Sequence, residues 1–524
     1  MAPANELRRE AFRGSRVLID RINRDSFGLA RFLVDLGAKV RVVGSGSIPD
    51  DLVEDAMVLK RLGAEIVSRC NLNAARYEYE VLFLDSYTSP RETFVLEARR
   101  RGKAVTTLAD LLFQLSPARK LAVTGSAGKS TTTMLVGEML AASGLSIYMP
   151  ISDAYKKQTA ENPYPNYELV QQLDQMSSCD WIVVELTSSH LEYMHVSPDV
   201  AVITTISPDH VEWHGSLEAY YEAKAVIMKH QSPDQWLIVN QDDELSQRLV
   251  SRYGRGQIMS FSLHRKVEPG VFVNDGRIIA AQGGEQVALA ATSDVRIPHG
   301  YLANLLGASA AALAVGGNVE AIGSVIRTFK GLRQRLEFVG RVDGVAVFND
   351  GLAATPRKAK AGLESFGDRS VILIAGGERR IEGYGSEGFL HSSPEERQRL
   401  RDVCRIAVRK CRRVVLVSDA GRDLEQVLDE EGYPSSHVTR VGTLRAASKE
   451  AVRVARNGDS ILLSPLYYMD LEEIAGFNAL IIEEAETAGR SVESPAMTGD
   501  GGEDSRKKAS RDAEGLGKGP GETR

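Results

Sequence analysis

Residues 120–135 constrain the fold most, because a buried strand, a loop of small residues and a helix are expected in succession there. The segment reads KLAVTGSAGKSTTTML, in which Gly125 and Gly128 free the backbone and Lys129 and Ser130 open the helix. Backbone N–H groups of such a loop wrap phosphate oxygens, the lysine neutralises them, and the hydroxyl can hold Mg²⁺. The common form has glycine where this chain has Val123, so an uncommon subtype of ATP-binding loop is predicted. The predicted ATP-binding residues of this loop are Gly125, Ser126, Ala127, Gly128, Lys129, Ser130 and Thr131.

Strand-like and helix-like stretches alternate in three blocks, which begin near RVLID (16–20), KLAVTG (120–125) and VAVFND (345–350). Apolar runs separated by helices indicate parallel sheets covered on both faces, so an α/β fold is predicted. A chain of 524 residues is also long enough for about three domains.

We therefore predict an N-terminal domain, a central domain and a C-terminal domain. Their expected ranges are 1–115, 116–318 and 319–492. Residues 493–524 are rich in glycine and charge and lack large apolar side chains, so a disordered tail is expected there.

Composition argues against several classes of partner. The formal net charge of -6 gives no electrostatic footprint for nucleic acid, and no run approaches the roughly 18 apolar residues of a membrane span. The first thirty residues resemble neither a signal peptide nor an anchor. The four cysteines form no CxxC pair, which favours free thiols in a reducing cytoplasm. We expect a cytoplasmic monomer that binds small molecules, neither nucleic acid nor membrane.

The loop TGSAGKST resembles that of the Mur ligases, the ATP-dependent amide-forming enzymes of peptidoglycan precursor assembly, and the resemblance covers about residues 120–489. It is strongest to the MurD type, the branch that adds D-glutamate to UDP-N-acetylmuramoyl-L-alanine. The resemblance implies a Rossmann-like N-terminal domain for the acceptor, a central P-loop domain for ATP, and a Rossmann-like C-terminal domain for the amino acid.

Two segments resemble the metal-binding parts of the family. WIVVELTSSHLE (181–192) matches a strand that ends in a metal-binding glutamate, here Glu185. ISPDHVEWHGSLEAYYEAKAVIM (206–228) implies a second metal ligand at His210 and a carbamylated lysine at Lys224. A carbamate derived from CO₂ would turn the lysine cation into a carboxylate-like ligand. With Ser130, the resemblance implies two Mg²⁺ sites.

Two further segments resemble the parts of the family that hold the nucleotide. HGYLANLLGASAAALA (299–314) implies that Asn304 contacts adenine, although Gly300 replaces the family's first asparagine. FKGLRQRLEFVGRVDGVAVFNDGLAATP (329–356) implies that Arg335 grips the γ-phosphate and that Asp350 hydrogen-bonds the ribose. A guanidinium suits the phosphate because its planar fork binds two oxygens at once.

The segments that would read the substrates depart from the family. DRINRDSFG (20–28) replaces a glycine-rich turn for the UDP diphosphate; its two arginines could take over that role or form a solvated charged loop. Residues 149–171 match nothing in the sugar-nucleotide segment, and the C-terminal segment GGERRIEG (376–383) has Arg379 and Arg380 where the family has Asp-Lys. The amino-acid pocket retains Thr355 and Ser464, but bulky residues follow in SPLYYMDLEEIAGF (464–477).

The resemblance implies a carboxylate–amine ligase that acts through an acyl phosphate, with Lys129, His210, Lys224 and Arg335 in the catalytic set. It also implies a small-molecule acid as the acceptor, for which a UDP-sugar peptide is one candidate, and an amino acid as the amine. A MurD-like ligase of a different acid and amino acid is one alternative, and a non-catalytic ATP-binding regulatory protein is another. Phosphate release that requires both an acid and an amine would separate the ligases from the binding protein.

Overall fold

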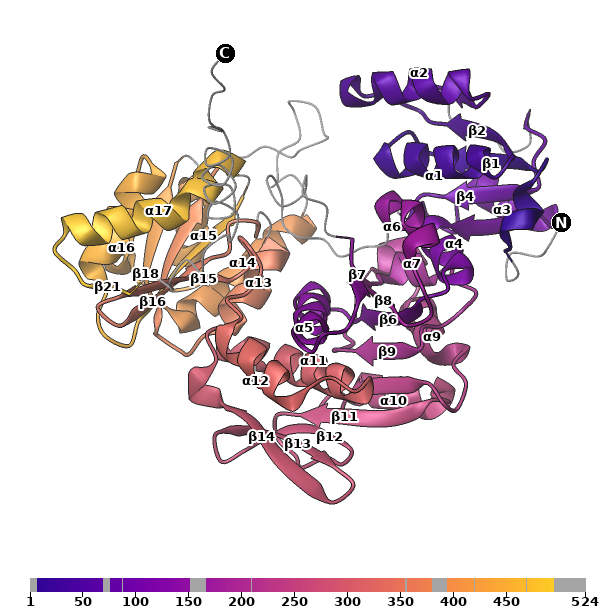
Figure 1. Cartoon of the computed structure of the whole chain (residues 1–524). Coiled ribbons are helices and arrows are strands. Elements are labelled where there is room, and N and C mark those ends of the chain that lie inside the picture. The colour runs from indigo at the N-terminus through magenta and orange to yellow at the C-terminus, as the bar shows by residue number, and fades with distance from the viewer. Residues whose placement is uncertain are drawn as a thin grey trace, which may run out of the picture.

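The structure is a computed structural model that describes residues 7–68, 76–86, 88–150, 166–208, 210–353, 356–378, 394–418, 420–467 and 469–493. Residues 494–524 of the expected tail, the candidate Thr355, and Arg379 and Arg380 lie outside these residues. The described part contains three sheets, of which the third ends at Glu493, one residue beyond the last predicted domain range. In Figure 1 the N-terminal and C-terminal sheets lie on different sides of the central part of the chain. The predicted α/β class is confirmed.

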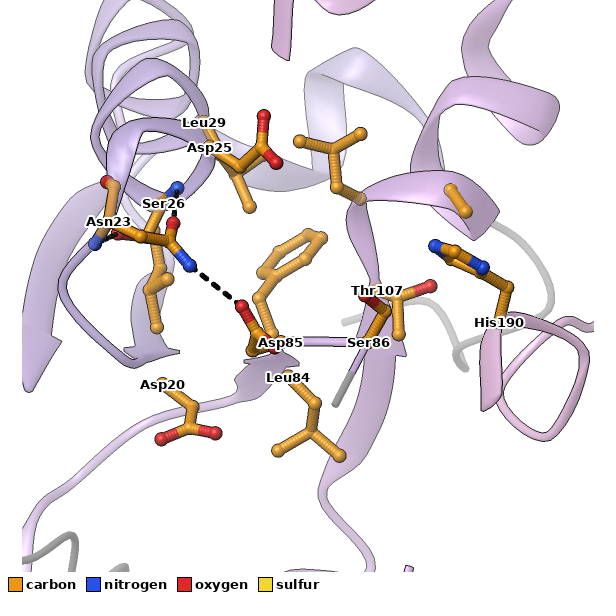
Figure 2. Close-up of a pocket in the computed structure, with 14 residues that line it drawn as sticks. Asp20, Asn23, Asp25, Ser26, Leu29, Leu84, Asp85, Ser86, Thr107 and His190 are labelled. Atoms are coloured by element: carbon orange, nitrogen blue, oxygen red, sulfur yellow. Dashed lines mark hydrogen bonds between the residues drawn. The ribbon is translucent and has the colours of Figure 1, made fainter. Parts of the chain in front are cut away.

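The N-terminal sheet is parallel, with strand order β3-β2-β1-β4-β5. Its strands are β1 (Arg16–Asp20), β2 (Lys39–Val43), β3 (Glu65–Val67), β4 (Val81–Leu84) and β5 (Ala104–Thr107), and its helices are α1 (Arg24–Asp35), α2 (Val53–Arg61), α3 (Thr93–Arg100) and α4 (Leu108–Leu115). The order reverses between β1 and β4, the place where open α/β sheets usually bind ligands. A small pocket opens at this carboxyl edge (Figure 2).

The central sheet has the order β14-β13-β12-β11-β10-β9-β6-β8-β7. Its strands are β6 (Arg119–Thr124), β7 (Ile147–Tyr148), β8 (Trp181–Glu185), β9 (Val200–Ile203), β10 (Trp236–Asn240), β11 (Gln257–Ser262), β12 (Gly270–Asn274), β13 (Arg277–Gln282) and β14 (Glu285–Ala291). Its helices are α5 (Lys129–Ala142), α6 (Tyr167–Gln171), α7 (Ser188–Leu191), α8 (Val211–His214), α9 (Leu217–Lys229), α10 (Glu244–Tyr253), α11 (Leu302–Ala314) and α12 (Val319–Thr328). The strands pair in parallel from β7 to β12, and β13 and β14 continue the sheet antiparallel.

The C-terminal sheet has the order β19-β18-β17-β20-β16-β15-β21, with β15 and β21 antiparallel to their neighbours. Its strands are β15 (Glu337–Val342), β16 (Val345–Asn349), β17 (Val371–Gly376), β18 (Cys411–Val417), β19 (Val438–Val441), β20 (Ser460–Leu466) and β21 (Val492–Glu493). Its helices are α13 (Pro356–Glu364), α14 (Pro394–Lys410), α15 (Ala420–Glu430), α16 (Leu444–Val454) and α17 (Leu471–Thr487).

Buried apolar clusters cover both faces of each sheet, as the continuous apolar strands predict. Two junctions join these cores. Phe32 of α1 packs against both an N-terminal and a central cluster, and Tyr301 packs against both a central and a C-terminal cluster. Tyr301 therefore marks where the central and C-terminal parts meet.

Two further expectations from the sequence concern membrane-spanning helices and the cysteines. In the described part of the chain, no helix combines the length and the apolar character that a membrane crossing requires. Cys179, Cys404 and Cys411 are free thiols, as predicted, and Cys70 lies outside the described residues.

Candidate functional site

The phosphate-binding loop connects β6 to α5 at the carboxyl edge of the central sheet. Its two glycines are required because neighbouring side chains approach the backbone closely. A Cβ atom on Gly125 would lie 1.9 Å from the Thr204 hydroxyl, and one on Gly128 would lie 2.2 Å from Oδ1 of Asn304. Gly128 also has a φ of 79°, in the left-handed region. Asn304, predicted to contact adenine, therefore packs directly on the loop.

Val123, the departure from the common motif, is explained by the strand. It belongs to β6, is fully buried, and pairs in register with Glu185 of β8 and Val202 of β9. The loop therefore starts two residues later, at Gly125, and is short. The same pairing fixes the end of β8 beside the loop.

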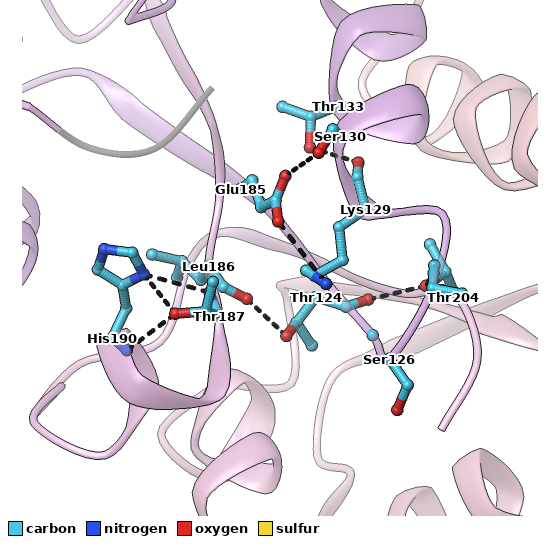
Figure 3. A network of polar contacts seen from close by, with 12 residues as sticks. Thr124, Ser126, Lys129, Ser130, Thr133, Glu185, Leu186, Thr187, His190 and Thr204 are labelled. Atoms are coloured by element: carbon cyan, nitrogen blue, oxygen red, sulfur yellow. Dashed lines mark hydrogen bonds and ion pairs between the residues drawn. The ribbon is translucent and has the colours of Figure 1, made fainter. Parts of the chain in front are cut away.

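Glu185 lies against both polar side chains that open α5 (Figure 3). The Ser130 hydroxyl donates a hydrogen bond of 2.5 Å to Oε2 of Glu185, and Nζ of Lys129 lies 3.7 Å from Oε1. The Glu185 side chain is only 1% exposed, so the charge of Lys129 compensates a carboxylate that is almost removed from water. This cluster offers two oxygen ligands and one cation to a phosphate chain.

Lys224 reaches the base of the loop from α9. Its Nζ donates to the carbonyl oxygen of Gly125 at 2.9 Å and to the hydroxyl of Thr124 at 3.4 Å, and the residue is 3% exposed. Tyr220, one turn earlier on α9, contacts the Ser126 hydroxyl at 2.7 Å and places its ring 5.2 Å from Nζ of Lys224. The two side chains tie α9 to the loop.

His210 lies just before α8 and lines the same cavity as the loop. Its φ of 50° is in the left-handed region, and its ring lies 6.2 Å from that of Tyr220. Among the residues that the structure describes, no three His, Cys, Asp or Glu side chains cluster closely enough to hold a metal ion. Of the predicted ligands, Ser130 and Glu185 contact each other, whereas His210 and Lys224 each lie near the ring of Tyr220.

A neutral histidine follows the glutamate strand. His190 is buried, and burial lowers the pKa of its imidazole to about 4. Its Nδ1 accepts a hydrogen bond from the Thr187 amide, and the Thr187 hydroxyl accepts one from the His190 amide, which together cap α7. His190 also lines the N-terminal pocket (Figure 2), and Ser188 and Ser189 of the same helix line the cavity that contains the loop.

Arg335 enters the site from the segment between the central and C-terminal sheets. Its Nη1 donates to the Ser130 hydroxyl at 3.1 Å, although 205 residues separate the two. The flanking residues Gln334 and Leu336 have φ values of 56° and 49°. Such backbone is strained for a side-chain-bearing residue and persists only where the surroundings hold it.

Two carboxylates hold this strained backbone. The Gln334 amide donates to Oε2 of Glu337 at 2.9 Å, and the Leu336 amide donates to Oδ1 of Asp350 at 3.1 Å. Glu337 in turn accepts from Asn478 of α17 at 3.1 Å. Because amides on both sides of Arg335 are fixed, its guanidinium is directed at the phosphate-binding loop.

Asp350 is buried at the end of β16, where it also accepts a hydrogen bond of 3.4 Å from the hydroxyl of Ser464. Ser464, a predicted amino-acid contact, is fully buried in β20 and directs its hydroxyl toward Asp350. The Ser464 hydroxyl therefore helps to position the carboxylate of Asp350.

One cavity of about 780 Å³ brings most of the candidates together. This is within the range of roughly 300–1,000 Å³ that is typical of ligand pockets. The predicted residues that line it are Ser126, Ala127, Gly128, Lys129, Ser130, Thr131, Glu185, His210, Asn304, Arg335 and Asp350. Three other predicted residues do not line the cavity but contact residues around it: Lys224 bonds to Gly125 at the base of the loop, and Ser464 bonds to Asp350.

Sequence reasoning missed several lining residues, among them Trp213, Tyr301 and Glu364. Burial, followed by the nearby charge of Asp350, raises the pKa of Tyr301, so its phenol stays neutral. An aromatic residue in the segment that supplies Asn304 was the available signal for Tyr301. Its contact with two cores could not be read from the sequence.

Comparisons with known proteins show what the chain as a whole is similar to. Residues 123–312 match the family model of the Mur ligase middle domain, and residues 334–466 match that of the Mur ligase, glutamate ligase domain. The UDP-N-acetylmuramoylalanine–D-glutamate ligase of Symbiobacterium thermophilum is 31% identical over 450 residues, which cover 85% of this chain and 91% of the relative. The enzyme of the same name from Acetivibrio thermocellus is 32% identical over 377 residues, 71% of this chain and 74% of that one.

A solved structure shares the fold. The crystal structure of MurF ligase from Thermotoga maritima in complex with ADP gives a TM-score of 0.52 at 16% identity, and covers 92% of this chain and 100% of that chain. At this identity the likeness concerns the fold alone.

Proposed function

Because the chain belongs to the Mur ligase family of ATP-dependent amide-bond ligases, we propose that it joins the carboxylate of a small-molecule acid to the amino group of an amino acid through an acyl phosphate. The curated relatives are named for UDP-N-acetylmuramoylalanine and D-glutamate, so a MurD-like reaction in peptidoglycan synthesis is the starting assignment. The observation that carries the proposal is the contact of Arg335 with Ser130, which joins the C-terminal part to the ATP loop.

We place ATP in this cavity in the orientation that the family resemblance implies. The loop N–H groups and Lys129 would hold the β- and γ-phosphates, Asn304 would contact adenine, and Asp350 would accept from the ribose. Asn304 and Asp350 both line the cavity that contains the loop, which supports this placement.

The donor set beside the loop fits Mg²⁺. Ser130 and Glu185 supply a hydroxyl and a carboxylate oxygen that already lie 2.5 Å apart, and hard oxygen ligands suit this ion, which keeps waters and phosphate oxygens as its other ligands. When bound, Mg²⁺ neutralises charge on the phosphates. We assign a first site to Ser130 and Glu185, and a second to His210 and the carbamate of Lys224.

A carbamate on Lys224 is compatible with its surroundings. Reaction of the neutral amine with CO₂ forms a nitrogen–carbon bond and releases one proton, and leaves an N–H and a carboxylate. The remaining N–H can keep the hydrogen bond to the Gly125 carbonyl, which Nζ already makes. The new carboxylate replaces a cation that would repel a metal ion.

The chain's residues then act mainly by position and charge. An oxygen of the acceptor carboxylate attacks the γ-phosphorus, the bond to ADP breaks, and Lys129 and Arg335 offset the charge on the transferring group. The amine attacks the acyl carbon, phosphate leaves, and the new amide loses a proton from nitrogen. Closure of the C-terminal part excludes water, because an acyl phosphate hydrolyses readily.

We further propose that the chain acts as a cytoplasmic monomer with domain boundaries at 115/116 and 318/319. Thr355 and Ser464 are assigned to the amino-acid pocket.

Phosphate release from ATP tests the proposed function. The full chain is incubated with Mg²⁺, bicarbonate, a panel of carboxylic acids that includes UDP-N-acetylmuramoyl-L-alanine, and D- or L-amino acids. We expect release that requires both an acid and an amine, with an amide product. Tight ATP binding without stimulation by any pair would instead favour a regulatory ATP-binding protein.

A further inference from the structure

The carboxyl edge of the N-terminal sheet differs from a diphosphate site in its backbone. The resemblance places the acceptor's UDP diphosphate in the turn after β1, where free N–H groups would bind it. In this chain the Arg21 amide donates to the Val43 carbonyl, and the Asn23 amide donates to the Ser26 hydroxyl. The Ser26 amide donates to the Asn23 side chain at 2.8 Å, which caps α1. These amides are already used.

Three of the side chains that line the pocket are aspartates, whose carboxylates carry charge of the same sign as a diphosphate. Asp20, Asp25 and Asp85 all line it (Figure 2), and the charge of Asp85 acts on the other two. Desolvation raises the pKa of Asp20, and the neighbouring Asp85 raises it further. Carboxylates directed at a phosphate group would repel it.

The two arginines of this turn, which the sequence offered as phosphate ligands, pair with acidic residues. Arg21 lies 3.8 Å from Asp85, and Arg24 donates to Asp51 at 3.1 Å. Both guanidinium side chains are about half exposed. The structure therefore favours the solvated charged loop over a cationic phosphate site.

Space is also restricted. The pocket encloses about 50 Å³, against the roughly 300–1,000 Å³ of ligand pockets. Helix α6 crosses α1: a Cβ atom on Gly28 would lie 2.3 Å from the Tyr167 ring, and the Tyr167 amide donates to Asp25 at 3.1 Å. Helix α6 of the central part therefore packs on α1 beside this edge and leaves no room for a larger side chain at Gly28.

We propose that this ligase recognises its acceptor acid without a nucleoside diphosphate, and that Asp20, Asp25 and Asp85 select against one at the N-terminal sheet edge. The inference rests on the proposed function and narrows its substrate class. The acceptor is an acid whose carboxylate reaches the ATP cavity and whose remainder carries no phosphate at this pocket.

Binding of UDP to the full chain tests the selection directly. Titration calorimetry with UDP, in the presence of Mg²⁺ and a non-hydrolysable ATP analogue, should show no saturable binding at the N-terminal edge up to about 1 mM. A dissociation constant below about 100 µM that ATP does not compete away would overturn the proposal.

Kinetics give a second readout that separates the inference from the proposed function. N-acetylmuramoyl-L-alanine and its UDP conjugate present the same carboxylate, and we expect their kcat/KM values with D-glutamate to differ by less than about tenfold. A loss of about 100-fold or more on removing UDP would contradict the inference. If no acid gives amine-dependent phosphate release, the proposed ligase function is wrong. A failure to bind UDP would in that case still support selection against a nucleoside diphosphate at the N-terminal sheet.

A charge variant tests the three carboxylates. The combined substitution Asp20→Asn, Asp25→Asn and Asp85→Asn should tighten UDP binding at least about tenfold, because the repulsion is removed while side-chain volume is kept. Asp35→Asn, at the other end of α1, is the matched control and should leave UDP binding unchanged. If the triple variant has the same unfolding temperature as the parent chain and yet binds UDP no more tightly, the selective role of the three aspartates is refuted.

Discussion

Arg335→Lys should lower kcat by about 10³-fold while the dissociation constant for ATP changes by less than about threefold. The guanidinium reaches Ser130 at 3.1 Å, so a lysine at the same position offers a single ammonium where a planar fork binds two phosphate oxygens. Its benefit is greatest when charge develops on the transferring phosphoryl group. The loss therefore belongs to the chemical step, which single-turnover phosphate release would measure.

The matched control for this variant is Arg333→Lys. Arg333 is exposed and lies two residues earlier in the same segment, so the control should keep kcat within about twofold. Equal losses in the two variants would indicate a general disturbance of the segment. A large rise in the ATP dissociation constant with unchanged kcat would contradict the assigned role of Arg335.

Lys224→Ala should reduce turnover by about 10³-fold or more, because it removes the group that we assign to the second metal site. The side chain is 3% exposed and contacts the Gly125 carbonyl, so its loss is felt at the base of the ATP loop. Addition of formate or acetate should restore part of the activity, since a small carboxylate can occupy the space of the carbamate. Turnover against carboxylate concentration measures the rescue.

Lys229→Ala is the control for this experiment. Lys229 lies on the same helix α9, pairs with Glu222 away from the cavity, and should be dispensable for turnover. Labelling the parent chain with ¹³C-bicarbonate should give a carbamate signal in the NMR spectrum that the Lys224→Ala variant lacks. Full activity of Lys224→Ala, or of the parent after removal of CO₂, would refute the carbamate.

The apolar runs of the sequence predicted the central strands of the sheets accurately. RVLID is β1 without change, and the predicted strand WIVVEL (181–186) differs from β8 by one residue. The apolar pattern of FGLARFLVDLGA predicts a helix over 27–38, whereas α1 spans Arg24–Asp35, because Asn23 caps it. Apolar periodicity reports which face is buried, whereas a cap depends on a single polar side chain.

The strands β12, β13 and β14, which form two antiparallel hairpins at one end of the central sheet, were missed, although the sequence contained a signal for them. Asp275 and Gly276 separate β12 from β13 with φ values of 48° and 69°, and Gly283 and Gly284 separate β13 from β14 with values of 62° and 84°. Asp-Gly and Gly-Gly between alternating apolar residues are the usual mark of tight hairpins.

The candidate site could be predicted only residue by residue. Motif matches supplied Lys129, Glu185 and Arg335, but not the strained backbone and the Glu337 contact that direct Arg335 at the loop. Contacts across 205 residues depend on how the central and C-terminal parts pack, which no local pattern encodes. Likewise, the arginines of the first turn could have bound phosphate, and their pairing with Asp85 and Asp51 emerged only in three dimensions.

Transfer of ¹⁸O from the acceptor carboxylate to inorganic phosphate tests the central claim most directly. From the panel of carboxylic acids, the one with the fastest amine-dependent turnover is labelled with ¹⁸O in both carboxylate oxygens. It is incubated with the full chain, ATP, Mg²⁺, bicarbonate and the amine, and the phosphate that is released is analysed by mass spectrometry. An acyl phosphate predicts one ¹⁸O atom in each phosphate released and the other in the amide carbonyl. Unlabelled phosphate that accompanies amide formation would contradict it.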